Sequence, residues 1–355
     1  MRKLTSTLLC LALSLLFTSR ALAWGNDGHK TVGEVAALYL AADNKTGVLA
    51  HIKDVLKGET LGEVATWADQ IKRKKFNPQH PSGDPDLDDF LKKTPDSRVW
   101  HFVDLPLGCP DYDHCKMGSS NKSFGDDTDI VQMIRTCIRR LQGETDAQHP
   151  MNERNALRML VHLMGDLHQP LHVGVRFMRA DEENGTFRVF TNPADIGDVA
   201  KSCSSPTVIC SDVGGNLLLL YGSDSTNLHA YWDESLVESA MERAQQDTPP
   251  DFADFLFQNA QPAAAWNGTG TDPLAWPVQW ANDTLRLSKE RAYKGVEVTG
   301  MRRADPFGQG SNDTLAFDIT KPRKYRADNV PVVERQLTKG GYRLAKLLEV
   351  VYKNF

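Results

Sequence analysis

Apolar residues recur at helical spacing in several long stretches of the chain. In the first stretch, Val32, Val35 and Tyr39 fall on one stripe. In the second, Asn152 is placed to cap the start of a helix and Pro170 to stop it. We therefore expect helices over residues 31–41, 152–169, 227–241 and 328–352.

Alternating strand patterns are scarce by comparison, and residues 186–190 give the best short one. Residues 176–213 and 295–327 are rich in Gly, Pro, Asp, Asn and Arg, and we expect both to be long loops. No repeat of fixed period and no linker divides the chain. The pattern predicts a mainly α, single-domain helical fold with long loops, spanning residues 24–355.

The first 23 residues read as a signal peptide. Arg2 and Lys3 precede an apolar run at residues 8–17 that is too short to span a membrane, and Ala21-Leu22-Ala23 resembles a cleavage site. We expect cleavage after Ala23, a secreted or periplasmic protein, and no membrane partner. Removing the three basic residues of the leader changes the net charge from −5 to −8. Such a charge argues against non-specific binding to nucleic acid or to anionic membrane.

Five cysteines follow the leader, and in an oxidising compartment close pairs suggest small loop staples. We favour Cys109–Cys115 and Cys203–Cys210, although four paired cysteines allow three connectivities. Cys137 falls in a stretch with helical spacing and is interpreted as a buried free thiol. Six Asn-X-Ser/Thr sequons have the setting of surface loops and would carry glycans in a eukaryotic host: Asn44, Asn121, Asn184, Asn267, Asn282 and Asn312.

Histidine and aspartate recur together at helical spacing. His162 and Asp166 are four residues apart, and His229 and Asp233 repeat that spacing in a second predicted helix. His172 follows Pro170, where the chain has turned. A single pair of this kind is usually a solvated contact, but two pairs and a histidine-rich turn in one chain favour a metal site.

Further candidate ligands stand in apolar surroundings. His29 and His101 are isolated histidines, and Asp69 lies on a probable helix bounded by apolar residues. Imidazole and carboxylate suit zinc, with ligand distances of about 2.0–2.2 Å. The absence of a Cys-x-x-Cys pattern is typical of a catalytic site rather than a structural one.

Several of these motifs stand in one order along the chain: "WGNDGH", "WADQIK", "WHFVDLP", "HLMGDLHQPLHVG", "GGN", "NLHAYWD" and "VVERQLTKGGYRLAKLL". In this order the sequence resembles the S1/P1 nuclease family, from residue 24 nearly to the C-terminus. The resemblance implies a helical fold of the phospholipase C/P1 nuclease type. It also implies a secreted zinc-dependent enzyme that cleaves single-stranded DNA and RNA to 5′-phosphorylated products and acts as a 3′-nucleotidase.

The resemblance further implies three zinc ions per chain. Asp69, His101, His162 and Asp166 would hold one ion. Asp166 would bridge to a second ion, held also by His29 and by the α-amine and carbonyl of Trp24. The third ion would be held by His172, His229 and Asp233. His168 matches a family position without being a ligand, and either orients a ligand or packs in the helix.

Other family positions carry expected substrate contacts. Asp69 and Asp166 would be catalytic, and Lys72 would either neutralise phosphate charge or be a solvated member of a basic run. Phe102 would either stack on a base or pack in the core, and Asp104 would accept hydrogen bonds from the base edge. Asn216 would add amide contacts to the base, next to glycines that allow close approach.

Two alternatives remain open. The first is a zinc phospholipase C-like hydrolase of the same fold, against which "WHFVD" and "GGN" favour the nuclease. The second is a non-catalytic secreted zinc-binding protein, against which the mixture of His and Asp on helices favours catalysis. An insertion relative to the family pattern, at about 176–213, would lie at the edge of the metal site and reshape the groove. We expect a monomer whose substrates are single-stranded nucleic acid and 3′-nucleotides.

Overall fold

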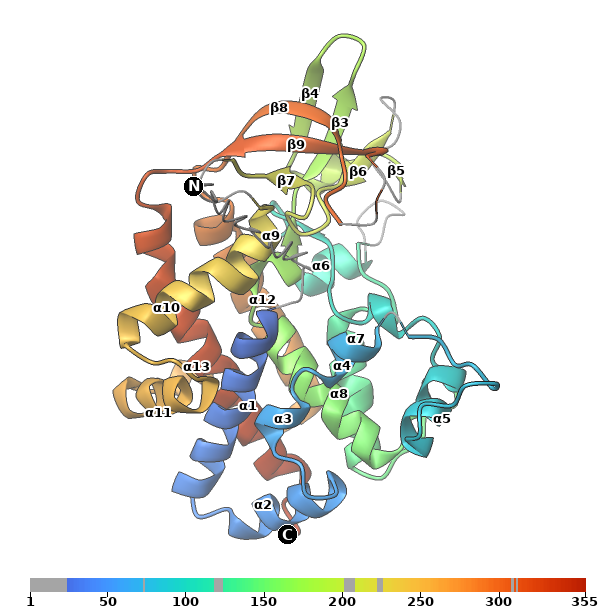
Figure 1. Cartoon of the computed structure of the whole chain (residues 1–355), viewed down its shortest axis with the longest axis vertical. Coiled ribbons are helices and arrows are strands. Elements are labelled where there is room, and N and C mark those ends of the chain that lie inside the picture. Colours follow the sequence, from blue (N-terminus) through green and yellow to red (C-terminus); the bar gives the residue numbers. More distant parts are fainter. Residues whose placement is uncertain are drawn as a thin grey trace, which may run out of the picture.

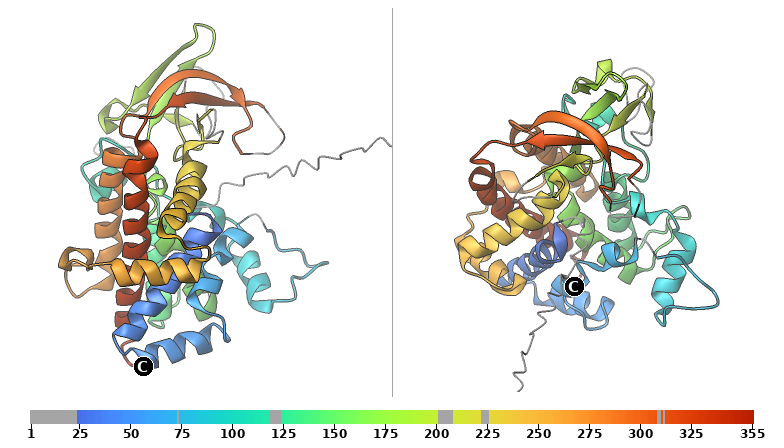
Figure 2. Two further views of the ribbon diagram at one scale, coloured as in Figure 1. Left: turned by 60° about the vertical axis from the view of Figure 1, so that its left-hand side comes forward. Right: turned by 45° about the horizontal axis from the view of Figure 1, so that its top comes forward.

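The computed structural model describes residues 24–72, 74–117, 124–200, 208–221, 226–307, 310 and 312–355. Helices form one body of the molecule, and the four-stranded and three-stranded sheets gather at one end of it, at the top of Figure 1. Both views in Figure 2 show the same separation of helices and sheets. The mainly α prediction is confirmed. None of the described helices is long and apolar enough to cross a membrane.

The α-helices that the structure describes are α1 (Gly25–Ala42), α2 (Thr46–Val55), α3 (Leu61–Val64), α4 (Trp67–Ile71), α5 (Pro85–Lys93), α6 (Tyr112–Met117), α7 (Ile130–Leu141), α8 (Glu153–Asp166), α9 (Leu228–Ala230), α10 (Leu236–Ala244), α11 (Pro249–Asn259), α12 (Trp276–Leu287) and α13 (Tyr325–Val351). A 3-10 turn, η2 (Pro170–His172), follows α8, and a π-helical turn, η5 (Tyr231–Ser235), joins α9 to α10. All four predicted helical ranges contain helices, although the helix predicted over 152–169 ends at Asp166. The Asn152 side chain caps α8 by accepting a hydrogen bond from Asn155 N at 2.8 Å.

The core of the helical body is the packing of α1, α8 and α13. Burial is nearly complete along α8, because neighbouring helices cover it on several sides. The glycines in the middle of α13 have a packing role: a Cβ on Gly341 would lie 2.5 Å from Val35 Cβ on α1. A glycine there lets the two helices approach closely, which outweighs its low helix propensity of about 1 kcal/mol.

The strands are β1 (Leu105–Pro106), β2 (Gly174–Val175), β3 (Phe177–Asp181), β4 (Thr186–Phe190), β5 (Val199–Ala200), β6 (Ile209–Ser211), β7 (Leu218–Leu219), β8 (Glu297–Ala304) and β9 (Thr314–Thr320). They form sheets of order β1-β2, β4-β3-β6-β5 and β7-β9-β8. The strand predicted at 186–190 is confirmed as β4.

The prediction of two long loops is wrong in both ranges. Residues 176–213 contain all four strands of the four-stranded sheet, and residues 295–327 supply the β8–β9 hairpin. The hydrophobic pattern of these strands is weak because much of their surface faces solvent. Most residues of β8 are exposed or half-buried, so its sequence lacks the alternation of a half-buried strand.

The cysteine and sequon predictions are confirmed in part. Cys109 and Cys115 form a disulfide, and Cys137 is a buried free cysteine. Cys203 lies outside the described residues, as does the sequon at Asn121. The surface-loop prediction is wrong at Asn282. This residue lies within α12, where its Oδ1 accepts a hydrogen bond from the backbone nitrogen of Tyr112 at 2.7 Å.

Candidate metal centre

Asp166, the last residue of α8, lies at the centre of the site and is fully buried. Its Oδ2 lies 2.9 Å from His101 Nδ1 and 3.1 Å from His162 Nε2. Its Oδ1 lies 3.2 Å from His29 Nε2. Asp69 of α4 completes the cluster, because its Oδ1 is 3.7 Å from His162 Nε2. The structure therefore brings four other predicted ligands, His29, Asp69, His101 and His162, close to the Asp166 carboxylate.

His29 reaches Asp166 because a glycine leaves room for it. The His29 ring stacks on that of His162, with ring centroids 4.0 Å apart and planes 13° from parallel. Gly165 of the same helix as His162 also lies against this ring, where a Cβ would come within 2.6 Å of His29 Nδ1. Trp24 precedes α1 and is completely buried. Its indole nitrogen donates to the carbonyl oxygen of Gly165 at 2.7 Å, which fixes the start of α1 against α8.

A further cluster joins His172 of η2 to His229 of α9 and Asp233 of η5. The Nε2 of His229 lies 3.2 Å from Asp233 Oδ2, and the rings of His172 and His229 are 4.9 Å apart. The Trp24 backbone nitrogen donates to Asp233 Oδ1 at 3.1 Å. This contact connects the third cluster to the cluster around Asp166.

Backbone carbonyls fix the orientation of three of the imidazoles. Because a carbonyl oxygen only accepts, the Nδ1 that faces it carries the proton and leaves Nε2 as the available ligand atom. These Nδ1–carbonyl pairs, each 2.7 Å long, are His162 with Ala65, His172 with His101, and His229 with Gly214. The hydrogen bonds thus prepare the rings to bind a cation.

The electrostatics of the site favour the metal-binding protonation states. Burial lowers the pKa of His29 and of His172, lowers that of His101 to about 4 and lowers that of His229 to about 3. These rings are therefore neutral at pH 7. His162 differs: burial lowers its pKa, but nearby carboxylates outweigh burial and raise the pKa above its ordinary value.

The carboxylates show the complementary pattern. Burial raises the pKa of Asp69, but His162, Lys72 and His101 lower it to about 2 overall. In the same way His162 and His172 overcome burial at Asp166 and hold its pKa well below the ordinary value. Burial raises the pKa of Asp233 well above its ordinary value, and hydrogen bonds from Gln169 and Trp24 oppose this only in part. A cation at Asp233 would reverse that shift.

Three triplets of ligand atoms could each hold a metal ion, with all atoms of a triplet within 4.8 Å of one another. They are His29, His162 and Asp166; Asp69, His101 and His162; and His172, His229 and Asp233. Several of their buried polar atoms have no hydrogen-bond partner among the described residues: both ring nitrogens of His29, His101 Nε2, His172 Nε2, Asp166 Oδ1 and Asp233 Oδ2. Buried polar atoms are normally satisfied, so this concentration of unpaired ligand atoms fits bound cations.

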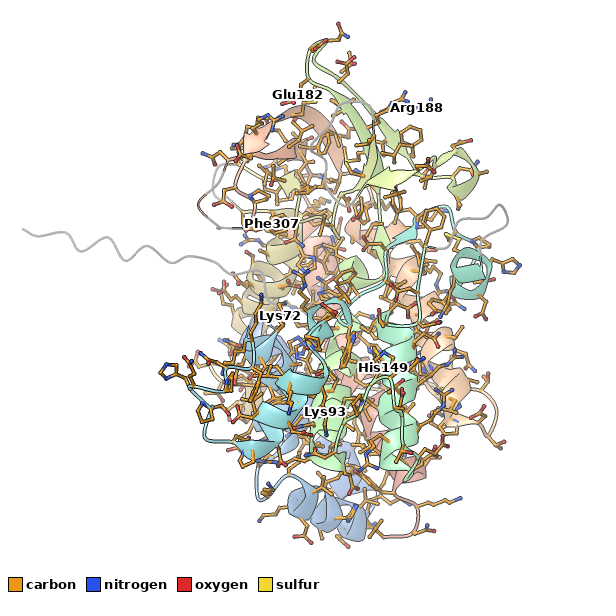
Figure 3. The ribbon with its side chains drawn as sticks, turned by 90° about the vertical axis from the view of Figure 1, so that its right-hand side faces the viewer. Lys72, Lys93, His149, Glu182, Arg188 and Phe307 are labelled. Carbon is orange, nitrogen blue, oxygen red and sulfur yellow. A yellow bond between two sulfur atoms is a disulfide. The ribbon has the colours of Figure 1, made fainter. Side chains whose placement is uncertain are left out.

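The expected substrate residues lie around these clusters. The Lys72 Nζ is 2.8 Å from Asp69 Oδ1, so this lysine is paired with a predicted ligand rather than simply solvated. Figure 3 shows it at mid-height, with Glu182 and Arg188 at the far end of the sheets. Phe102 is not a core residue, since 36% of its surface is exposed. Asp104 is half-buried three residues after His101, and burial raises its pKa to about 6.

Asn216 lies in a tight turn beside His229. The Cβ of an alanine at Gly214 would lie 2.3 Å from the Leu171 carbonyl oxygen, so the turn requires glycine there. The Asn216 side-chain nitrogen donates to the Val213 carbonyl at 2.8 Å. Its Oδ1 is buried without a partner within the described part of the chain. The amide oxygen is therefore the atom of Asn216 that remains able to accept a hydrogen bond.

His168 does not orient a metal ligand, and the prediction that it continues the helix is wrong. The helix α8 ends at Asp166, and the chain turns before His168. The buried His168 ring donates from Nδ1 to the Met164 carbonyl at 2.7 Å and meets Arg343 NH1 at 3.2 Å from Nε2. It therefore belongs to the packing between α8 and α13.

The adjacent Gln169 has the orienting role that sequence reasoning did not assign. Its buried side-chain nitrogen donates to Asp233 Oδ1 at 2.7 Å, and its Oε1 accepts from Leu171 N. Glutamine is common in proteins, and nothing in its local sequence marks it except its place inside "HLMGDLHQPLH".

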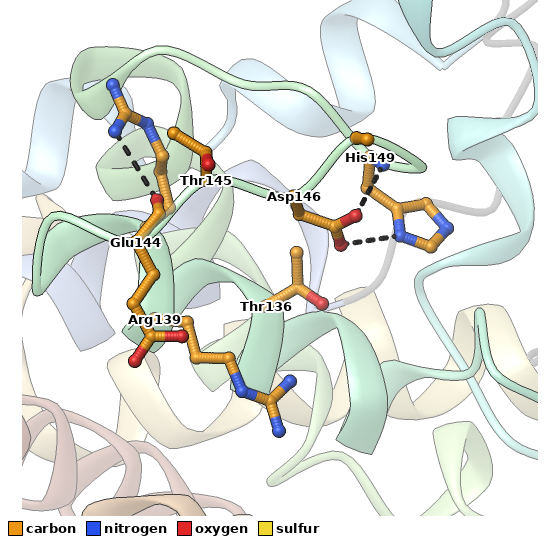
Figure 4. Close-up of a pocket in the computed structure, with 8 residues that line it drawn as sticks. Thr136, Arg139, Glu144, Thr145, Asp146 and His149 are labelled. Carbon is orange, nitrogen blue, oxygen red and sulfur yellow. Dashed lines mark hydrogen bonds and ion pairs between the residues drawn. The ribbon is translucent and has the colours of Figure 1, made fainter.

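A pocket of about 200 Å³ lies elsewhere, between α7 and the segment that follows it (Figure 4). Its lining includes Arg139, Glu144 and His149, and His149 Nδ1 pairs with Asp146 Oδ2 at 3.0 Å. None of the candidate metal ligands lines it.

Comparison with known proteins identifies the family. A family model described as S1/P1 Nuclease matches residues 24–353. The chain belongs to the S1/P1 nuclease family. It is 24% identical to Endonuclease 5 of Arabidopsis thaliana over 345 residues, covering 94% of this chain and 91% of that protein. It is 24% identical to Nuclease S1 of Aspergillus oryzae over 359 residues, covering 96% of each chain.

This S1/P1 family member is also similar in sequence to Nuclease P1 of Penicillium citrinum. The two are 25% identical over 346 residues, which covers 93% of this chain and 98% of the relative. These named relatives are nucleases, and membership of the S1/P1 nuclease family supports nuclease activity for this chain.

Proposed function

We propose that this protein is an exported, monomeric, zinc-dependent phosphodiesterase that hydrolyses single-stranded DNA and RNA to 5′-phosphorylated products and also acts on 3′-nucleotides. The observation that carries this proposal is the set of three buried His/Asp triplets, one of which contains His101, the neighbour in sequence of the exposed Phe102. Nuclease names among the relatives support the phosphoester chemistry. Cleavage after Ala23 would expose the amine of Trp24.

The donor set fits zinc, since it consists of imidazole nitrogens and carboxylate oxygens without thiolates. Asp69, His101, His162 and Asp166 would hold one ion. Asp166, His29 and the amine and carbonyl of Trp24 would hold a second. His172, His229 and Asp233 would hold a third. Bound zinc would supply Lewis acidity, a lowered pKa for water and charge stabilisation of the leaving oxygen.

The residues of the chain would position and balance charge around the phosphate. Asp69 is ionised and lies on the side of the cluster that Lys72 approaches, so it could accept a hydrogen bond from the attacking water. The Lys72 ammonium, 21% exposed and 2.8 Å from Asp69, is placed to neutralise a phosphate oxygen. Asp166 holds His29, His101 and His162 together and thereby fixes the spacing of the first two sites.

Preference for single strands follows from the need to stack an unpaired base. A duplex hides its base faces, whereas a single strand exposes them to an aromatic ring such as Phe102. Asp104 would accept hydrogen bonds from the base edge, and Asn216 Oδ1 would accept another. Stacking on an aromatic ring contributes about 1–3 kcal/mol per base.

The test uses the purified mature protein with and without a chelator. Cleavage of single-stranded DNA, single-stranded RNA, duplex DNA and phosphatidylcholine would be compared at equal enzyme concentration. The proposal predicts chelator-sensitive cleavage of the single strands, with slower cleavage of the duplex. Cleavage of phosphatidylcholine alone would move the assignment to a phospholipase. Metal binding without any cleavage would indicate a non-catalytic zinc-binding protein.

The role of Trp24 has its own test. A variant that retains one extra residue before Trp24 has no free α-amine at that position, although the indole contact with Gly165 could persist. We expect this variant to bind one zinc fewer and to lose most of its activity. Full zinc content with full activity would show that the Trp24 amine is not a ligand.

A further inference from the structure

Ser211 brings the 176–213 segment into contact with the site. It is the last residue of β6, and it pairs with Phe177 of the antiparallel strand β3. A small apolar cluster that includes Phe177, Phe190, Ile196 and Ile209 lies within the same segment and packs it together. The segment therefore presents Ser211 from a folded sheet rather than from a free loop.

Two hydrogen bonds fix the orientation of the Ser211 hydroxyl group. Its Oγ accepts a hydrogen bond from Val213 N at 2.8 Å, and its side chain also hydrogen-bonds to the Asp104 carboxyl. Val213 has a φ of 54°, an unusual value for a β-branched residue, and this conformation belongs to the turn that follows β6. Because the oxygen of Ser211 already accepts, its hydrogen is available to donate to Asp104.

The backbone around Asp104 is fixed independently. Val103 N donates to the His172 carbonyl at 2.9 Å, and Leu105 N donates to the Val173 carbonyl at 3.0 Å. These bonds on both sides of Asp104 leave its side-chain rotation as the remaining freedom. The hydrogen bond from the Ser211 hydroxyl restricts this rotation.

The residue after Ser211 anchors it from the other side. Asp212 is completely buried, and its Oδ1 accepts from the Tyr293 hydroxyl and from Gly215 N, each at 3.1 Å. Its backbone nitrogen donates to the Arg176 carbonyl at 2.9 Å. The same turn leads on to Asn216, so Ser211 and the amide expected to contact the base belong to one rigid unit.

We propose that Ser211 is a positioning residue for base recognition, whose hydroxyl holds the Asp104 carboxylate with an oxygen directed at the edge of a base stacked on Phe102. This inference rests on the proposed function and on the base contacts assigned there. It gives the 176–213 segment a role in reading the nucleobase and none in cleaving the phosphoester bond.

The experiment compares wild type with Ser211→Ala and Ser211→Thr on two substrates, 3′-AMP and a baseless 1,2-dideoxyribose 3-phosphate. Losing one hydrogen bond to a carboxylate should raise KM for 3′-AMP about tenfold and leave kcat/KM for the baseless substrate within about twofold. Ser211→Thr keeps a hydroxyl and should retain wild-type KM. Ser239→Ala is the matched control, because the half-buried Ser239 hydroxyl of α10 donates to the Ser235 carbonyl of η5, one helical turn before it.

Each outcome separates the inference from the proposed function. If Ser211→Ala loses activity equally on both substrates, Ser211 has only a structural role. If the variant loses no activity on either substrate, Ser211 does not position Asp104. If wild type cleaves the baseless substrate as well as 3′-AMP, the base is not read and the inference is overturned, while the phosphoesterase proposal stands. If wild type cleaves neither substrate nor single-stranded DNA, the proposed function itself fails and the inference fails with it.

Discussion

Replacing Gly165 with alanine would place a methyl group against a candidate metal ligand. The new Cβ would lie 2.6 Å from His29 Nδ1 and 2.9 Å from Cε1 of the same ring. Ordinary contacts of this kind lie at about 3.5–4.0 Å, so the ring must move by roughly 1 Å. Its movement is restricted further by the ring of His162, which is stacked on it with ring centroids 4.0 Å apart.

The size of this displacement decides the expected result. A zinc site tolerates about 0.2 Å in its ligand distances, and loss of a supporting contact typically costs 10–100-fold in metal affinity. We expect Gly165→Ala to weaken binding at the His29 site by at least about tenfold and to reduce nuclease activity similarly. In the metal-free protein the higher helix propensity of alanine, about 1 kcal/mol, would offset part of the clash.

Gly340→Ala is a matched control. Gly340 is also a helical glycine beside a histidine ring, but its Cβ would lie 3.4 Å from His168 Cγ, close to ordinary contact. Metal titration with a competing chelator, followed by cleavage of single-stranded DNA, would be carried out on both variants. If Gly165→Ala binds metal and cleaves DNA as well as Gly340→Ala does, the assignment of His29 as a ligand is refuted.

Three further predictions concern orientation, ionisation and the disulfide. Gln169→Leu removes the donor to Asp233 and should weaken metal binding at that site 10–100-fold, measured by chelator competition; unchanged affinity would contradict the orienting role. Burial raises the pKa of Asp212 to about 7, so the folded protein binds a proton there more tightly than the unfolded chain does. The stability that this proton contributes is lost as the pH rises through 7. The difference in unfolding free energy between wild type and Asp212→Asn, measured by urea unfolding, should therefore fall by at most about 4 kcal/mol between pH 4 and pH 8. A difference that does not change with pH would show that the pKa of Asp212 is not raised. Replacing Cys109 and Cys115 by serine should cost about 2 kcal/mol of unfolding free energy, because the disulfide closes a short loop, and a variant of equal stability would contradict that.

The helical part of the fold was predictable because its signal is local. The stripe of Val32, Val35 and Tyr39 reports burial directly, and α1 contains all three. The sheets could not be found in this way. Strand β7 pairs in parallel with β9, so that Leu218 lies beside Phe317, and nothing near either residue in sequence indicates the other.

The clustering of the candidate metal ligands was predictable in part. Spacings of four residues placed His162 with Asp166 and His229 with Asp233, and the structure brings each pair together. The side chains that orient ligands and substrate residues were harder to predict, because their contacts depend on tertiary packing. Ser211, for example, meets Asp104 only because β6 pairs with β3 and ends beside β1 and β2.

The most direct test of the proposed function is the zinc content of the purified mature protein, measured together with its cleavage of single-stranded DNA before and after chelation, in wild type and in Asp166→Asn. Asp166 contacts His29, His101 and His162, so its loss should affect two of the three sites. We predict three zinc ions per chain in wild type, chelator-sensitive cleavage, and both a lower zinc content and no turnover in the variant. A wild-type protein that carries almost no zinc, or an Asp166→Asn variant that keeps substantial turnover, would contradict the proposed zinc-dependent function.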